Sequence, residues 1–433
     1  MTLEKAKYDR THDCFLQLGH FPVINEEVKR DLPEESHAGY FQLVLPASWY
    51  EDEQGECYPP EIFEGQAFSS ASTTMTEKEI QNLRKKRKGR KKTPQNGNFS
   101  GKPICIILAG TGEHGFSRRG QFLAYPLAES GVASIILESP FYGLRKPKHQ
   151  WGSKLKQLSD LPILGRATIE EARSLIKWIK EHTSFGPIIL TGTSMGGLHA
   201  AMTASLTPIE VGAVSWLGPT SAAPVFTHGA LSGSVDWMAM CRDVTEGKVD
   251  FDANYPAGYV ESIAFDPENR IEKGLRAYEK EVIEDVQAFI QRDDVNIPRQ
   301  LKLVAHEELE KASERLDARV EDLHDSEVES DESVNGLESS FKIAQHQITR
   351  FLHLTNLLHV PPPLRPEAVT FVAAMYDQYV PPPLQEEEWQ SVLQRWKGAK
   401  LRWMTGGHVS ATLWPLETEN HKATILNCIE TLK

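Results

Sequence analysis

Nucleophilic catalysis is the chemistry that the segment around Ser194 could perform. Ser194 lies in Gly192-Thr193-Ser194-Met195-Gly196, between an apolar run at 187–191 that predicts a strand and a small-residue segment at 196–206 that predicts a helix. In such a strand–turn–helix, Gly192 and Gly196 keep Cβ atoms away from neighbouring backbone, and the serine is strained with its Oγ exposed above the sheet. The dipole of the following helix favours negative charge that develops there. The segment therefore predicts a nucleophile elbow.

A general base and an orienting carboxylate, which a weakly nucleophilic serine needs, lie farther along the chain. The chain order for this arrangement is serine, acid, histidine. Asp377 follows a predicted strand at 369–374, and His408 follows a predicted strand at 401–404 and two glycines. Because the carboxyl ends of parallel strands meet at one edge of a sheet, both side chains are expected beside Ser194. The alternatives are a helix-capping role for Asp377 and a solvated loop position for His408.

Backbone N–H groups near Ser194 could bind an oxyanion. One expected donor is Met195, the residue after the nucleophile. The other is expected from the glycine-containing loop at 109–115, where Thr111 and Gly112 are the candidates and Gly110 is a further one. This chemistry needs no metal and no organic cofactor.

The same loop has a second interpretation as a phosphate cradle. The segment from Gly110 to Gly115 has only the first, third and sixth positions of the dinucleotide fingerprint. Glu138 ends the next predicted strand, but Pro140 and Phe141 follow it. A dinucleotide-binding enzyme is therefore the weaker hypothesis.

Strands alternating with helices must position these residues. The alternation predicts an α/β-hydrolase fold, in which a mostly parallel central sheet is covered by helices on both faces and carries a helical cap insertion. The expected strands are at 103–108, 132–137, 187–191, 211–217, 368–374 and 400–404, and the expected helices are at 121–130, 169–181, 196–206, 387–396 and 421–432.

The chain divides into five predicted parts. They are an N-terminal segment with one strand at 41–45 (1–56), a basic low-complexity insertion (57–101), the first part of the hydrolase core (102–220), a helical cap or insertion (221–360) and the second part of the core (361–433). The insertion at 221–360 is expected to contain helices at 272–292 and 298–323. It could be a lid or a decoration of the domain.

Two charged runs lie within the insertions. The basic run at 84–92 repels itself and predicts a disordered loop, with a nuclear signal or an anionic-membrane contact as alternatives. The acidic run at 325–332 is too polar to bury, so a disordered segment is expected over 324–340.

Composition limits the classes of function. The formal net charge of −13 over 433 residues argues against general nucleic-acid binding. Five cysteines without a C-x-x-C pair suggest neither a disulfide framework nor a zinc site, and favour a reducing intracellular compartment. The sequence shows no apolar run of about 20 residues and no secretory signal.

Several segments resemble the family of α/β-hydrolase domain-containing protein 18. They are Leu108–His114, Glu138–Pro147, Thr191–Gly197, Val225–Ser232 and Gly406–Ala411, and the long Pro-Phe-Tyr-Gly-Leu-Arg-Lys-Pro segment is far more specific than the elbow. The resemblance covers about 103–240 and 366–433. It implies a serine hydrolase with Ser194, Asp377 and His408 as its triad and lipid acyl esters, including membrane phospholipids, as the substrate class. The expected compartment is cytoplasmic or organelle-associated, and only the resemblance suggests a mitochondrial one. Peripheral association with a membrane is a further expectation.

Basic residues flank the expected site loops. Arg118, Arg119, Arg145 and Lys146 could contact a headgroup phosphate, because guanidinium groups bind phosphate in bidentate fashion, or could form structural ion pairs. A thioesterase, a peptidase or an acyltransferase would use the same triad. The rival from another class is a catalytically idle hydrolase fold that acts as a scaffold. The sequence leaves the oligomeric state open.

Overall fold

The computed structural model describes most of the chain outside two long segments. The described residues are 1–4, 6–23, 25–50, 101–150, 152–153, 155, 160–235, 237, 332–353, 355–381, 386–410 and 415–433. The basic run at 84–92, the expected helices at 272–292 and 298–323, and the acidic run up to residue 331 lie outside the described residues.

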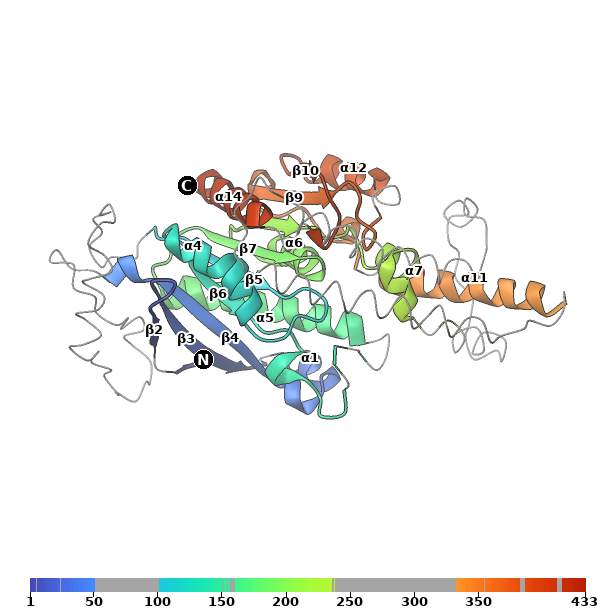
Figure 1. Ribbon diagram of the computed structural model, residues 1–433, viewed down its shortest axis with the longest axis horizontal. Helices are drawn as coiled ribbons and strands as arrows, with labels where there is room; N and C mark the ends of the chain where they lie inside the picture. Colours follow the sequence, from blue (N-terminus) through green and yellow to red (C-terminus); the bar gives the residue numbers. More distant parts are fainter. Residues whose placement is uncertain are drawn as a thin grey trace, which may run out of the picture.

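A ten-stranded sheet forms the centre of the fold, with the order β1-β3-β4-β6-β5-β7-β8-β9-β10 and β2 paired to β3 (Figure 1). The strands are β1 (Thr2–Leu3), β2 (Lys7–Asp9), β3 (Cys14–Pro22), β4 (Ala38–Pro46), β5 (Ile104–Leu108), β6 (Ala133–Leu137), β7 (Ile188–Thr193), β8 (Gly212–Trp216), β9 (Val369–Ala374) and β10 (Lys400–Met404). The six neighbouring strands β6, β5, β7, β8, β9 and β10 pair in parallel. Strands β1 to β4 pair antiparallel with one another, and β4 pairs antiparallel with β6. The expected mostly parallel sheet is confirmed.

Helices cover both faces of this sheet. The helices of the described residues are α1 (Glu26–Asp31), α3 (Ser117–Arg119), α4 (Tyr125–Glu129), α5 (Asp160–His182), α6 (Met195–Leu206), α7 (Ala223–Thr227), α11 (Glu332–His353), α12 (Glu386–Arg395) and α14 (Pro415–Leu432), of which α7 and α11 lie beside the sheet rather than on it. A π-helical turn, Gly120–Ala124, precedes α4. The 3-10 turns are Glu34–Ser36, Ala47–Tyr50, Gly143–Arg145, Ala230–Ser234, Leu357–His359 and Pro366–Ala368.

The central strands are buried along their whole length, which explains their continuous apolar sequences. Side chains alternate between the faces: in β5, Ile104, Ile106 and Leu108 belong to the core cluster that also holds residues of α5, α6 and α12, whereas Cys105 and Ile107 belong to the cluster that holds residues of α4 and α14. The two cores hold the sheet between helical layers. The carboxyl ends of the parallel strands therefore share one edge.

The N-terminal region differs from the sequence prediction. One strand was expected in residues 1–56, and the structure has four, with nine residue pairs between β3 and β4. Only four of the nine residues of β3 are buried, so its apolar pattern is weak. Its pairing with β4 determines its conformation.

The predicted insertion at 221–360 is described at its two ends. α7 and α11 extend side by side away from the sheet and share a small core of Ala223, Phe341, Ala344, Ile348 and Leu352 (Figure 1). The expectation of disorder over 324–340 is wrong for residues 332–340, because α11 begins at Glu332. The apolar face from Phe341 onward anchors this helix, and an acidic composition does not prevent its first turns from forming. A lid role stays a prediction.

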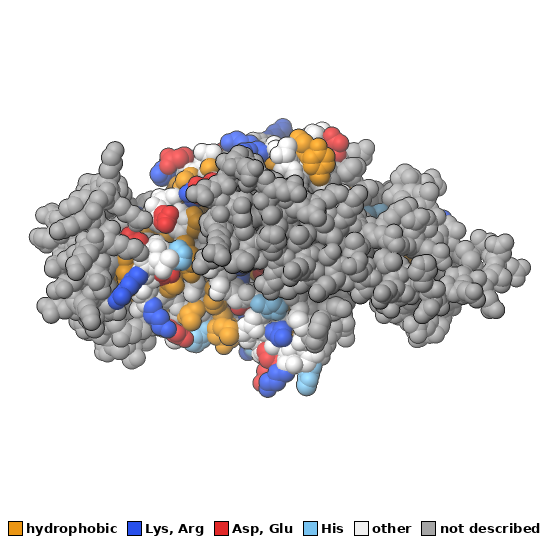
Figure 2. All heavy atoms as spheres, viewed as in Figure 1, with side chains coloured by type: hydrophobic (Ala, Val, Ile, Leu, Met, Phe, Trp, Pro, Cys, Tyr) orange, Lys and Arg blue, Asp and Glu red, His pale blue; other side chains and the backbone are white. Residues whose placement is uncertain are grey.

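On the face shown in Figure 2, basic and acidic side chains of the described residues are interspersed rather than gathered into a patch of one sign. Within the described ranges, no helix combines the length and the apolar character needed to cross a bilayer. The same residues contain no cluster of three His, Cys, Asp or Glu side chains suited to a metal ion. The described cysteines Cys14, Cys105 and Cys428 are buried free thiols.

Candidate active site

The turn at Ser194 has the strained backbone that the sequence predicts. Ser194 lies between β7 and α6 with φ 56° and ψ −121°, a conformation that a non-glycine residue rarely adopts. Its N–H donates to the carbonyl of Trp216 on β8 at 2.8 Å. Its carbonyl accepts from the N–H groups of Gly197 and Leu198 at 2.9 and 3.1 Å, so both sides of the turn are held. These hydrogen bonds hold the backbone of Ser194 in its strained conformation.

Two glycines make this turn possible. A Cβ atom at Gly192 would lie 2.6 Å from the carbonyl carbon of Gly196 and 2.7 Å from the carbonyl oxygen of Leu108. A Cβ atom at Gly196 would lie 2.6 Å from that same Leu108 oxygen and 2.9 Å from the oxygen of Ala109. These neighbours are backbone atoms and cannot rotate away. The close approach of α6 to the end of β5 therefore requires glycine at both predicted elbow positions.

Gly196→Ala should displace the end of β5 from α6. The expected cost is about 1–3 kcal/mol of unfolding free energy, as for overpacked cores. The rate at which a fluorophosphonate labels Ser194 should fall about 10²-fold, because small displacements of reacting groups are costly. Thermal unfolding and single-turnover labelling measure the two effects.

Gly131→Ala is the matched control for this change. Gly131 has φ +78°, but a Cβ atom there would meet nothing within 4 Å, so the variant loses stability through backbone strain alone. Its labelling rate should equal that of the wild type. If Gly196→Ala had the same stability and labelling rate as the wild type, that result would contradict the steric argument.

Asp377 and His408 form a hydrogen-bonded pair. Asp377 Oδ2 lies 2.7 Å from Nδ1 of His408, and the two residues are 3% and 8% exposed. Asp377 Oδ1 accepts from the N–H groups of Tyr379 and Val380 at 2.9 and 2.8 Å. The carboxylate is therefore fixed at both oxygens, and Nδ1 of His408 is the ring nitrogen that it orients.

Backbone bonds join the two loops that carry this pair. The N–H of Met375 donates to the carbonyl of Met404 at 3.0 Å, and the N–H of Tyr376 donates to the carbonyl of Gly406 at 3.2 Å. The Tyr379 ring stacks on His408 with centroids 4.6 Å apart. Because β7, β9 and β10 run parallel, Ser194 and the Asp377–His408 pair lie at the same edge of the sheet.

The predicted oxyanion donors divide into two groups. Met195 is the first residue of α6, so its N–H has no partner within the helix. Thr111, Ser194 and Met195 border one cavity. Gly110 lies close to the elbow, because a Cβ there would lie 3.1 Å from the carbonyl oxygen of Thr193. Gly112, with φ +77°, is instead a turn residue whose carbonyl accepts from Ser153 Oγ.

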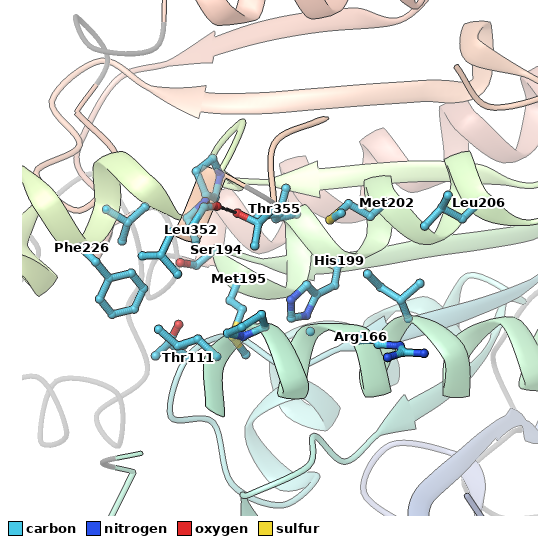
Figure 3. Close-up of a pocket in the computed structure, with 18 of the residues that line it drawn as sticks. Thr111, Arg166, Ser194, Met195, His199, Met202, Leu206, Phe226, Leu352 and Thr355 are labelled. Atoms are coloured by element: carbon cyan, nitrogen blue, oxygen red, sulfur yellow. Dashed lines mark hydrogen bonds between the residues drawn. The ribbon is translucent and has the colours of Figure 1, made fainter. Parts of the chain in front are cut away.

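The cavity that begins at Ser194 is an apolar groove of about 260 Å³ between α5 and α6. Figure 3 shows Thr111, Met195 and Phe226 near Ser194, with Met202 and Leu206 farther along α6. The apolar lining residues are Leu161, Pro162, Ile169, Met195, Leu198, Met202, Leu206, Pro219, Ala222, Val225, Phe226 and Leu352. The polar lining residues are Thr111, Arg166, Glu170, Ser194, His199 and Thr355. An apolar chain fits the larger, apolar part of this lining.

Two of the four predicted phosphate contacts are wrong. Arg145 is 0% exposed and makes a bidentate pair with Glu171, and the same two terminal nitrogens also donate to the carbonyls of Glu138 and Ser36. Arg119 is 6% exposed, and its guanidinium donates to the carbonyls of Ile107, Leu137 and Gly115. Both guanidinium groups already serve as internal donors.

The other two predicted contacts remain open to solvent. Arg118 is exposed, with 53% of its side chain accessible and Glu113 at 4.0 Å, and Lys146 is half-buried. Their assignment to a headgroup therefore stays a prediction.

Sequence reasoning missed residues that shape the site through tertiary contacts. Glu113 accepts from the N–H of Gly110 at 2.8 Å and so closes the loop after β5. Tyr379 covers one face of His408. His199 borders the groove and lies four residues after Met195 and three before Met202. Helical spacing was the signal that could have placed His199 on the same face as these methionines.

A family model described as alpha/beta hydrolase domain containing 18 matches residues 60–430. The solved structures similar to the chain include a proline iminopeptidase-related protein from Thermus thermophilus, with 14% identity, 96% of this chain and 99% of that chain covered, and a TM-score of 0.41. A monoacylglycerol lipase from Paleococcus ferrophilus has 14% identity, with 77% and 97% of the two chains covered and a TM-score of 0.34. Est1E from Butyrivibrio proteoclasticus, with ferulic acid bound, has 16% identity, 76% and 90% coverage and a TM-score of 0.33.

Proposed function

Because the chain belongs to the family described as alpha/beta hydrolase domain containing 18, we propose that it is a serine hydrolase that cleaves an acyl ester of a lipid or phospholipid. The observation that carries the proposal is the 2.7 Å hydrogen bond between Asp377 and His408 at the sheet edge that also holds the strained Ser194. A strained serine and a buried acid–histidine pair are the parts that acyl transfer needs.

The proposed reaction has two halves. His408 Nε2 takes the proton of Ser194 as Oγ bonds to the ester carbonyl carbon, and the imidazolium then gives that proton to the departing alcohol. Water attacks the acyl-serine in the second half, and His408 again takes and returns the proton. Asp377 holds His408 in the Nδ1–H tautomer and stabilises its cationic form. The N–H of Met195, with a second donor from the loop at Thr111, binds the oxyanion.

The groove supports an apolar acyl group as the part of the substrate that enters the protein. Its walls are helices α5 and α6, and its lining is mostly apolar, with Arg166 and Glu170 among the polar residues that border it. Exposed apolar side chains at Met375, Tyr376 and Trp403 lie on and after the strands that lead to Asp377 and His408, which supports the proposed approach to a lipid surface. Arg118 and Lys146 are the proposed headgroup contacts.

Ser194→Ala should abolish covalent labelling by a fluorophosphonate and reduce acyl release by at least about 10⁴-fold, because the nucleophile is lost. The measurement is labelling of purified protein followed by fatty-acid release from a panel of phospholipids, a neutral acylglycerol, an acyl thioester and a peptide. His408→Ala should lose labelling as well. Ester, thioester, amide and acyl-transfer activities are separated by which panel member yields product.

Ser174→Ala and His182→Ala are matched controls, because both residues lie on α5 and hydrogen-bond to backbone carbonyls of that helix. Both variants should keep wild-type labelling. A folded wild type that neither labels nor releases acyl groups would favour the scaffold hypothesis instead.

A further inference from the structure

His199 is a buried imidazole whose Nδ1 lacks a hydrogen-bond partner within the described part of the chain. It lies on α6, is 6% exposed and borders the groove that begins at Ser194. Among the described residues, no side chain or backbone group hydrogen-bonds to its buried Nδ1. Burial lowers the pKa of His199 to about 4, so the ring is neutral near pH 7. A neutral imidazole presents one N–H donor and one acceptor nitrogen, and the described residues leave Nδ1 without a partner in either role.

The packing around His199 keeps the ring in the groove. Figure 3 shows the imidazole extending from α6 toward α5, between Met195 and Met202. On α5, a Cβ atom at Gly165 would lie 3.0 Å from Nε2 of His199, so glycine leaves the space that the ring occupies. His199 thus places a neutral polar ring partway along a mostly apolar lining, which Arg166 and Glu170 of α5 also border.

An unpaired polar group in an apolar site is unfavourable, and a hydrocarbon chain beside it cannot relieve that cost. A hydroxyl can do so with either tautomer of the ring, because it both donates and accepts. The groove would therefore gain more from a chain with an oxygen at this depth than from an unsubstituted chain.

We propose that His199 is a specificity-determining residue that selects acyl chains carrying a hydroxyl group near the middle of the chain. This inference rests on the proposed function, since it takes the groove as the acyl site of Ser194. His199 has no part in the bond-breaking steps. The favoured substrates are esters of mid-chain oxygenated fatty acids.

The depth of His199 sets the expected position of the oxygen. Five residues of α-helix separate it from Ser194, or roughly 7.5 Å along the axis of α6. An extended alkyl chain with bonds of about 1.5 Å advances about 1.25 Å per carbon. The hydroxyl should therefore lie on about the sixth to eighth carbon from the carbonyl.

The test compares 4-methylumbelliferyl esters of dodecanoic, 7-hydroxydodecanoic and 12-hydroxydodecanoic acids. The wild type should hydrolyse the 7-hydroxy ester with a kcat/KM roughly tenfold above that of the unsubstituted ester, the effect of one buried hydrogen bond. The 12-hydroxy ester should show no such gain. His199→Leu should reverse the preference, and His199→Gln should retain part of it.

Met202→Leu is the matched control, because it changes a groove residue on the same face of α6 without changing its polarity. This variant should keep the preference for the 7-hydroxy ester. If the His199 variants do not fold, the wild-type ratio alone decides: equal or lower kcat/KM for the 7-hydroxy ester overturns the inference.

Calorimetric titration of the wild type with free dodecanoic and 7-hydroxydodecanoic acids separates this inference from the proposed function. Tighter binding of the hydroxy acid supports His199 recognition even if no ester is cleaved, in which case the hydrolase proposal fails alone. Hydrolysis of dodecanoyl ester with equal binding of the two acids overturns the His199 proposal alone, and a water bound to the ring then satisfies it.

Discussion

Asp377→Asn should lower kcat for ester hydrolysis by about 10³–10⁴-fold while leaving the protein folded. Oδ1 of Asp377 accepts from two backbone N–H groups. In the variant, the carbonyl oxygen of the introduced amide can take the place of Oδ1 and accept from the same two groups. The amide NH₂ would then face Nδ1 of His408 in place of Oδ2, 2.7 Å away. Its donors favour the tautomer with the proton on Nε2. That nitrogen could no longer accept the proton of Ser194.

The measurement is steady-state hydrolysis of a single ester, together with thermal unfolding. The N-terminal region offers a matched control, because Asp9 Oδ2 lies 2.9 Å from Nδ1 of His12. This pair has the same chemistry but does not lie at the sheet edge that holds Ser194. Asp9→Asn should therefore keep wild-type kcat. Near-normal kcat in Asp377→Asn would mean that Asp377 only shapes its loop, and the helix-capping alternative would replace the triad.

The elbow could be predicted from the sequence because its determinants are local. A buried strand, two glycines around Ser194 and a small-residue helix fix that turn within about 20 residues of chain. Asp377 and His408 could be predicted because parallel strands deliver their following loops to one edge. Their pairing rests on interloop bonds from Met375 and Tyr376 that no local pattern indicates.

The direction of a side chain in the tertiary structure could not be predicted from neighbouring residues. Arg118 and Arg119 are adjacent in sequence, yet one is exposed and the other donates to three internal carbonyls. The neighbours Arg145 and Lys146 also differ in exposure, since Arg145 is buried and Lys146 is half-buried. Sequence places a basic residue near a site, whereas burial decides whether its charge is free for a ligand.

The second large effect is expected at the Arg145–Glu171 pair. Arg145 connects the carbonyl of Ser36 before β4, the carbonyl of Glu138 after β6, and Glu171 on α5. Both side chains are at most 3% exposed. Glu171→Gln would leave the guanidinium buried without a compensating charge, at a cost of about 3–5 kcal/mol of unfolding free energy. Chemical denaturation of the variant measures this loss.

Glu27→Gln is the matched control, because Glu27 makes a 2.9 Å ion pair with Arg166 while its side chain is 72% exposed. Its effect on the unfolding free energy should stay within about 0.5 kcal/mol, since water screens the exposed pair. The double variant Arg145→Met with Glu171→Met should recover much of the loss, because neither charge is then buried alone. If Glu171→Gln instead left stability unchanged and raised KM for a phospholipid, Arg145 would be reaching the substrate. The structural assignment of this arginine would then fail.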